Sequence, residues 1–254
     1  DLMGNPGPES GVANGVDECV KAVRQRYKDG SDLIKITASG GVLSVAKSGQ
    51  NSQFSIEEIQ AIIKTANDYG FKVAAHCHGE EAMRRAVIGG VHSIEHGTYM
   101  SEEVMKLMKE RGTYLVPTIT AGKSVGLFAK IPNYYPDIVV PKALAIGPKI
   151  QKTFERAYKY GVKIAFGTDA GVFAHGDNSK EFIYMNEVGM PFMEILKTAT
   201  INASDLLGQS DLIGTIEKGK FADIIAVDGD PSKDIRVMGK VAFVMKAGKV
   251  YKNE

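Results

Sequence analysis

Helical segments that end at glycine alternate with short apolar runs along most of this chain, and this alternation limits the folds open to it. In the first unit, apolar residues at helical spacing over 16–27 precede a turn at 29–32 and the apolar run 33–37. The plan repeats with predicted helices at about 55–69, 80–88, 102–109 and 142–160, and predicted strands at 72–76, 92–96, 113–117 and 162–167. Five such units predict an α/β fold with a parallel sheet and helices packed outside it.

The last part of the chain has a different pattern. Three more predicted helices, at about 179–188, 191–200 and 203–207, are followed by glycine-punctuated, β-prone runs at 214–216, 222–227, 241–245 and 249–251. We therefore divide the chain into an α/β body over 1–208 and an antiparallel β segment over 209–254. Such strands need pairing partners, and another segment would supply some of them.

Composition excludes several function classes. With 44% hydrophobic and 24% charged residues over 254 positions, the chain is long enough to bury a substantial core. Its net charge of +1 and the lack of a dense Lys/Arg run argue against a nucleic-acid partner. No apolar run approaches the roughly 20 residues of a membrane helix, so we expect no membrane partner. The oligomeric state stays open, with a homo-oligomer among the options.

The start of the chain bears on its completeness and its compartment. It lacks an initiator methionine and opens in a Gly/Pro-rich stretch over 4–15, so we expect an N-terminal truncation. Cys19 and Cys77 form no CxxC motif and predict neither a thiolate zinc cage nor a disulfide framework. Free thiols favour the cytoplasm, whereas a signal peptide upstream would mean a periplasmic or secreted protein.

Polar residues lie within or at the ends of the predicted strands: Lys35, His76, His96 and Asp169. Each has a structural explanation if taken singly, such as a lysine reaching for water or an aspartate in a turn. In a (β/α) barrel, however, reactive groups gather at the C-terminal strand ends, where these four would meet. Two imidazoles and a carboxylate suit Zn²⁺. A lysine fits such a site if CO₂ carboxylates its amine to an anionic carbamate, whose two oxygens can bridge two metal ions.

These motifs resemble the amidohydrolase superfamily, in particular its metal-dependent dipeptidases, its prolidase-like (Xaa-Pro dipeptidase) enzymes and its imidazolonepropionase-like members. The resemblance rests on the segments 32–36, 73–76, 93–98, 167–169 and 214–224. It implies the C-terminal five units of a (β/α)8 barrel plus part of a small β-sandwich domain. It also implies that Lys35 is a bridging carbamate and that His76, His96 and Asp169 belong to the fifth, sixth and eighth strands.

One feature departs from the superfamily pattern. Its members carry a His-x-His pair on the first strand, upstream of the lysine, and no such pair precedes Lys35. The segment His76-Cys77-His78 has the right form but follows Lys35, so we interpret His76 as the fifth-strand ligand and His78 as a rim residue. The first three units would then be missing. Lys35, His76 and His96 would hold one metal, and Asp169 with the absent pair the other.

The resemblance implies that a metal-activated hydroxide hydrolyses an amide bond of a small substrate, such as an Xaa-Pro or Xaa-Arg/Lys dipeptide. Asp169 would carry the proton from the hydroxide to the leaving amine. Substrate-binding candidates are His78, Tyr99 and His175, which lie beside the predicted ligands. Two alternatives stay open: a cyclic-amide hydrolase or deaminase of the same superfamily, and an inactive metal-binding barrel fragment.

Overall fold

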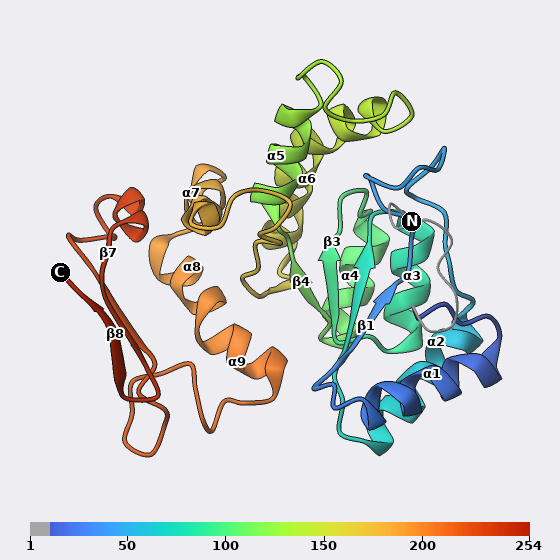
Figure 1. The fold of residues 1–254 in the computed structure, drawn as a ribbon, viewed down its shortest axis with the longest axis horizontal. Coiled ribbons are helices and arrows are strands. Elements are labelled where there is room, and N and C mark those ends of the chain that lie inside the picture. The colour runs from blue at the N-terminus through green and yellow to red at the C-terminus, as the bar shows by residue number, and fades with distance from the viewer. Residues whose placement is uncertain (1–10) are drawn as a thin grey trace.

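Five short parallel strands form the main sheet in the computed structural model, which describes residues 11–254 (Figure 1). Their order in the sheet follows their order in the chain. The strands are β1 Ile34–Thr37, β2 Val73–Cys77, β3 Ser93–His96, β4 Tyr114–Val116 and β5 Lys163–Ile164. The parallel sheet and the alternation of helix and strand confirm the predicted fold class. The Gly/Pro-rich stretch at the start of the chain lies mostly outside the described residues.

The helices that precede the first four strands are α1 Val16–Lys28, α2 Ile56–Asp68, α3 Glu80–Gly89 and α4 Glu102–Arg111. Local sequence determines where they begin and end. Ser55 and Glu58 form the capping box of α2, in which each side chain accepts a hydrogen bond from the backbone N–H of the other. Gly90 and Gly112 end α3 and α4 in the left-handed conformation, which glycine adopts without steric cost.

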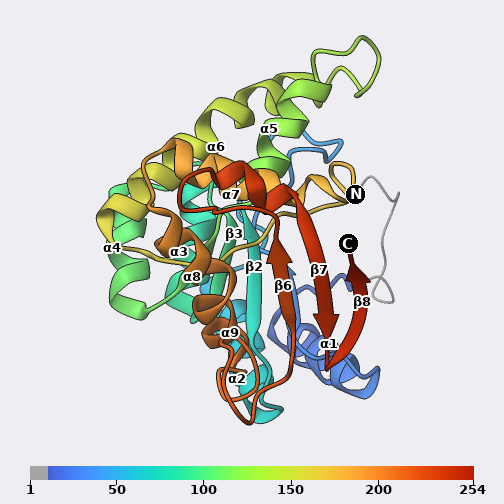
Figure 2. The ribbon, with the colours of Figure 1, turned by 90° about the vertical axis from the view of Figure 1, so that its left-hand side faces the viewer.

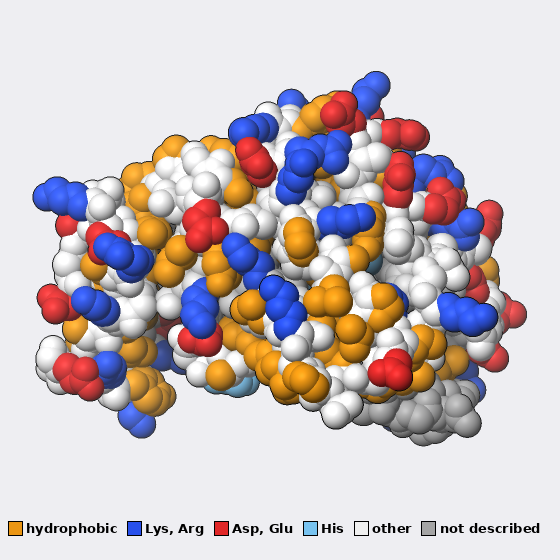
Figure 3. Space-filling view, turned by 90° about the horizontal axis from the view of Figure 1, so that it is seen from above, with side chains coloured by type: hydrophobic (Ala, Val, Ile, Leu, Met, Phe, Trp, Pro, Cys, Tyr) orange, Lys and Arg blue, Asp and Glu red, His pale blue; other side chains and the backbone are white. Residues whose placement is uncertain are grey.

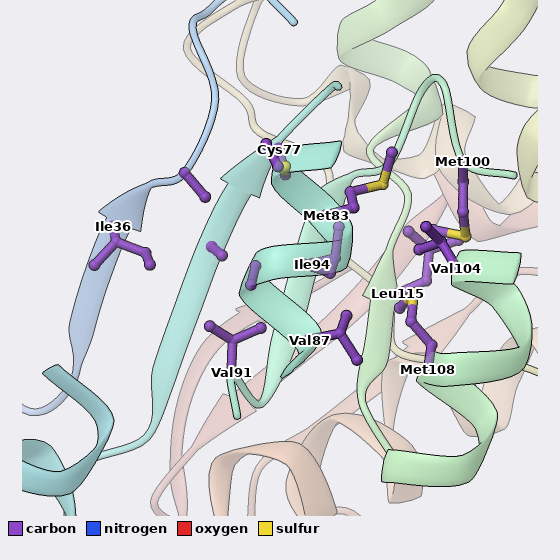
Figure 4. Packing of buried hydrophobic residues seen from close by; sticks show 14 of the residues in the cluster. Ile36, Cys77, Met83, Val87, Val91, Ile94, Met100, Val104, Met108 and Leu115 are labelled. Carbon is purple, nitrogen blue, oxygen red and sulfur yellow. The ribbon is translucent and has the colours of Figure 1, made fainter. Parts of the chain in front are cut away.

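The two faces of the sheet differ in chemistry. One face carries apolar side chains such as Ile36, Cys77, Ile94 and Leu115, all buried. Figure 4 shows α3 and α4 packed on this face through buried hydrophobic side chains, among them Met83, Val87, Val104 and Met108. Burial of one such side chain contributes roughly 1.5–3 kcal/mol.

The opposite face carries polar side chains at matching positions. The register pairs Thr37 with His76 and His76 with Glu95, and side chains at paired positions of a parallel sheet project from the same face. Lys35 projects there too, two residues before Thr37. A face of a parallel sheet that displays lysine, histidine and glutamate does not form an ordinary core. It is therefore the first place to look for a functional site.

A helical hairpin connects β4 to β5, made of α5 Ile119–Phe128 and α6 Val140–Tyr160. Its first helix was not predicted, since Gly122 and Gly126 weaken the helical pattern. Both glycines instead permit close packing: a Cβ on Gly122 would come within 2.8 Å of Ile150 on α6. The hairpin exposes several hydrophobic side chains, and Figure 3 shows hydrophobic side chains gathered on the face seen from above. The exposed residues of this segment are Leu127, Ile131, Tyr134, Ile138 and Leu144.

The C-terminal part adds the helices α7 Lys180–Glu187, α8 Phe192–Ala199 and α9 Ile201–Leu207 and a second, antiparallel sheet (Figure 2). The strands of this sheet are β6 Ile224–Val227, β7 Val241–Lys246 and β8 Lys249–Asn253. The strand predicted at 214–216 is wrong: Gly214 has a φ of 95° and Ile216 is 80% exposed. The prediction at 162–167 was too long, because Phe166 donates its N–H to Thr198 on α8 rather than to a strand.

Two further expectations concern cysteines and membranes. Cys19 and Cys77 are both free thiols and both buried. Within residues 11–254, no helix combines the length and the apolar character needed to cross a bilayer.

Candidate metal centre

Three histidine rings meet at the C-terminal ends of β2 and β3. His76 lies in β2, His78 follows that strand directly, and His96 ends β3. The sheet register pairs Cys77 with His96, so both strands deliver their imidazoles to one edge. The ring centroids are 4.6 Å apart for His76 and His96, and 4.8 and 4.9 Å from each of them to His78. One ligand atom from each ring lies within 4.8 Å of the others, a spacing that one metal ion can span.

Threonine hydroxyls orient two of these rings. Nδ1 of His78 lies 2.9 Å from Oγ1 of Thr98, and Nδ1 of His96 lies 2.6 Å from Oγ1 of Thr118. A hydroxyl can accept from a protonated Nδ1, which leaves Nε2 unprotonated and free to bind a metal ion. Partners of this kind hold metal-binding imidazoles in the required tautomer and orientation.

Burial favours the uncharged form of all three imidazoles. It lowers the pKa of His76 to about 4, against the raising effect of the Gly40 carbonyl and with a smaller lowering by Lys35. It lowers the pKa of His78 to about 3, with a smaller lowering by His76. Burial also lowers the pKa of His96 well below its ordinary value. At neutral pH the cluster is therefore uncharged. Neutral imidazole is the form that binds metal ions, so no proton has to be displaced.

Charged side chains face the same space from neighbouring strands. Lys35, Glu95 and Asp169 line one cavity of about 500 Å³ together with the three histidines. Although the side chain of Lys35 is exposed, the protein around its amine desolvates it and lowers its pKa, against the opposing effect of the Glu95 and Asp169 carboxylates. Desolvation likewise raises the pKa of Glu95 and of Asp169, and Lys35 opposes this in both. The three groups are thus close enough to influence each other's charge.

The remaining walls of the cavity are mainly apolar. They come from the loop after β1, from the α5–α6 hairpin and from the segment after Asp169, and include Val42, Leu43, Val125, Ile146, Ile150 and Val172. Lys35 is the single cationic side chain among the described residues that line the cavity. A small molecule with an apolar group fits such a space beside the polar cluster.

Three residues around the cluster adopt the left-handed backbone conformation without being glycine. Their φ angles are 72° for His96, 48° for Thr118 and 56° for Asp169. Residues with a Cβ are uncommon in this region, and each such conformation costs on the order of 1 kcal/mol or more. Strain of this kind persists where surrounding contacts enforce it, and it is concentrated at functional sites. Here it accompanies two predicted ligands and the partner of one of them.

The structure brings the four predicted ligands, Lys35, His76, His96 and Asp169, to one cavity. Asp169 lines its wall but lies outside the group of three close imidazoles. The placement of His78 at the rim was wrong, because its side chain is 5% exposed and belongs to the cluster. A strand-by-strand interpretation could not show that His96, from the next strand, would cover it.

The other two substrate-binding candidates lie farther from the cluster. Tyr99 lines a separate cavity of about 90 Å³ that also touches His78, and the amine of Lys149 lies 4.6 Å from its ring centre. His175 is exposed in a turn and is not among the described residues that line either cavity. The structure therefore does not bring His175 to the histidines.

Sequence reasoning missed Thr98, Thr118 and Glu95 as members of the site. Thr118 follows the predicted strand 113–117, so the rule applied to the other strand ends would have found it. Glu95 lies beside His76 because the register of β2 and β3 pairs the two residues. Its electrostatic interaction with Lys35 depends on the register of three strands, which one sequence does not give.

Comparisons with known proteins agree with this geometry. The profile of the Amidohydrolase family matches residues 3–251. A crystal structure of an Xaa-Pro dipeptidase with bound methionine in the active site is 57% identical, with a TM-score of 0.95 over 98% of this chain and 61% of that chain. Ochratoxinase from Aspergillus niger is 35% identical over 95% of this chain and 50% of its own length. Imidazolonepropionase from Caldanaerobacter subterraneus subsp. tengcongensis is 30% identical over 70% of this chain and 39% of its own.

The chain thus spans about half the length of the curated relatives it matches. The match extends over nearly all of this chain, and both the strand order and the histidine cluster are consistent with it. This chain belongs to the amidohydrolase family.

Proposed function

We propose that the protein hydrolyses an amide bond of a small substrate, with Xaa-Pro dipeptides as the substrate class. The observation that carries the proposal is the meeting of three neutral imidazoles, Lys35 and Asp169 on one cavity with apolar walls. The likeness to an Xaa-Pro dipeptidase with methionine in its active site supports the same class of substrate.

The residues present fit a metal ion. His76 and His96 would bind it through imidazole nitrogens, and Lys35 would add an oxygen ligand if it is carboxylated, whereas Asp169 would belong to a second ion. Nitrogen and oxygen donors in this combination favour Zn²⁺. When bound, the metal supplies an activated water near neutral pH and polarises the substrate carbonyl. A carbamate on Lys35 would place another negative charge beside Glu95 and Asp169, which a divalent cation offsets.

Asp169 is proposed to move the proton. Its carboxylate follows β5 in the chain and lines the cavity, and desolvation raises its pKa. A carboxylate with a raised pKa accepts a proton from water more readily and can then release it to the leaving amine. His78 is proposed to contact the substrate, because its ring lies in the cluster while the resemblance does not require it as a ligand.

The cavity wall favours an apolar substrate over a cationic one. Val125, Ile146 and Ile150 offer no partner for a guanidinium or an ammonium group, which would lose its hydration against them. We therefore favour Xaa-Pro dipeptides with an apolar Xaa over Xaa-Arg or Xaa-Lys. The α5–α6 hairpin, which contributes these side chains, would be the specificity element.

A substrate panel with the zinc-loaded intact protein tests this proposal. We expect Met-Pro and Leu-Pro to be cleaved with a higher kcat/KM than Leu-Arg and Leu-Lys. Hydrolysis of a substrate with an imidazolone ring, measured in the same assay, tests the cyclic-amide alternative. Preferred turnover of that ring would overturn the dipeptide assignment, and no turnover of any substrate with zinc bound would favour an inactive metal-binding protein.

A further inference from the structure

Glu181 is a fully buried carboxylate that belongs to none of the groups described above. It lies on α7 and accepts three hydrogen bonds from the start of α5. Its Oε1 accepts from the N–H of Ile119 at 2.8 Å, and its Oε2 accepts from the N–H and the hydroxyl of Thr120 at 2.8 and 2.6 Å. Burial of a carboxylate is costly unless its oxygens are well satisfied. These three bonds offset part of that cost.

The start of α5 needs an outside partner because of the position of Thr118. Thr118 is the N-cap residue of α5, and a threonine there ordinarily accepts a hydrogen bond from an amide of the first turn. Its hydroxyl makes no such bond and instead forms a hydrogen bond of 2.6 Å with Nδ1 of His96. The first amides of α5 would lack an acceptor without Glu181. Glu181 thus performs the capping that Thr118 does not.

Backbone strain adds a second reason. Thr118 has a φ of 48°, which a threonine adopts only when its neighbours enforce it. The two residues after it are the ones whose amides Glu181 holds. We infer that Glu181 is a positioning residue for His96: it fixes the first turn of α5, which keeps the Thr118 hydroxyl on the imidazole. This inference rests on the proposed role of His96 as a metal ligand.

The second histidine–threonine pair offers a matched control. The carbonyl of Thr98, the partner of His78, accepts a hydrogen bond from the hydroxyl of Thr153 on α6 at 2.7 Å. A side chain from an outer helix is therefore present in both cases: Thr153 bonds Thr98 itself, whereas Glu181 bonds the two residues that follow Thr118. Thr153→Val should disturb His78 and leave His96 unchanged, whereas Glu181→Gln should do the reverse.

The test uses imidazole ¹⁵N chemical shifts of the metal-free protein together with zinc affinity measured by chelator competition. In Glu181→Gln, an amide NH₂ replaces one acceptor oxygen without a change in size. We expect the Nδ1 shift of His96 to move as it does in Thr118→Val, and zinc affinity to fall about 10- to 100-fold. Glu187→Gln, an exposed neighbour on α7 that pairs with Lys123, should change neither.

Coupling between the two residues separates positioning from a general structural role. If Glu181 acts through Thr118, the double variant should bind zinc no more weakly than Thr118→Val alone. Fully additive losses, or an unchanged His96 shift in Glu181→Gln, would overturn the inference. If Glu181→Gln fails to fold, Thr120→Val decides instead: it removes one of the three bonds and should move the His96 shift in the same direction, and no movement would overturn the inference.

These readouts also separate this inference from the proposed function. The His96 shift is measured without metal and without turnover. A protein that cleaves no dipeptide but shows the Glu181-dependent shift would contradict the proposed activity alone. A protein that cleaves Xaa-Pro dipeptides and shows no such shift would contradict the positioning role alone.

Discussion

The hydroxyl of Thr118, two residues after β4, lies 2.6 Å from Nδ1 of His96, at the end of β3. This contact joins two strand ends and fixes one ring of the histidine cluster. We predict that Thr118→Val lowers zinc affinity about 10- to 100-fold, because the ring loses the partner that sets its tautomer. Thr118→Ser keeps the hydroxyl and should bind zinc nearly as the wild type does. Equal affinity in the valine and serine variants would contradict the role of this hydroxyl.

Asp169→Asn should reduce kcat for an Xaa-Pro dipeptide by roughly 10²–10⁴-fold, because the amide cannot accept a proton from water. Steady-state kinetics with zinc content measured on the same samples provides the check. Asp177→Asn is the control, since this exposed aspartate pairs with Lys180. Unchanged turnover in Asp169→Asn at full zinc occupancy would exclude Asp169 as the proton carrier.

The histidine cluster should make the metal-free protein sensitive to acid. Burial lowers the pKa of His78 to about 3, below the value of about 6.5 in the unfolded chain. Between these values the unfolded state takes up a proton that the folded state does not, so the free energy of unfolding falls as pH is lowered from 6.5. The loss is roughly 3 kcal/mol by pH 4. Urea unfolding at both pH values should show a smaller loss in His78→Gln, and an identical loss would refute this origin.

Glu181 should have the opposite effect over an overlapping range. Desolvation raises its pKa to about 7, against the lowering effect of its hydrogen bonds to Thr120 and Ile119. The folded state then binds a proton that the unfolded state has released, so the free energy of unfolding falls as pH rises from about 4.5 to 7. The contribution is on the order of 3 kcal/mol. The stability difference between wild type and Glu181→Gln should therefore shrink over this range, and a constant difference would contradict the prediction.

The sequence predicted the units around β1 to β4 well, because their signals are local. The capping box at Ser55 and Glu58 and the glycine that ends α4 both lie within a few residues of the boundaries they set. The first helix of the hairpin was missed for the opposite reason. The group that caps it, Glu181, lies 62 residues away in the chain from the amide of Ile119.

The residues of the candidate site divide in the same way, into those with a local sequence signal and those that depend on contacts distant in the chain. Lys35, His76, His96 and Asp169 could be found because each lies in or just after a predicted strand. The burial of His78 could not be predicted, since it depends on the ring of His96 from the neighbouring strand. The threonine partners were likewise hidden, since Thr98 lies 20 residues from His78 and Thr118 lies 22 residues from His96.

The most direct test of the account is the initial rate of Met-Pro hydrolysis by the intact protein, stripped of metal and then titrated with Zn²⁺. We predict no measurable hydrolysis without metal and a rate that rises to saturation as zinc fills the histidine cluster, with His96→Asn failing to recover. Hydrolysis that survives complete metal removal, or zinc binding without any hydrolysis, would contradict the account.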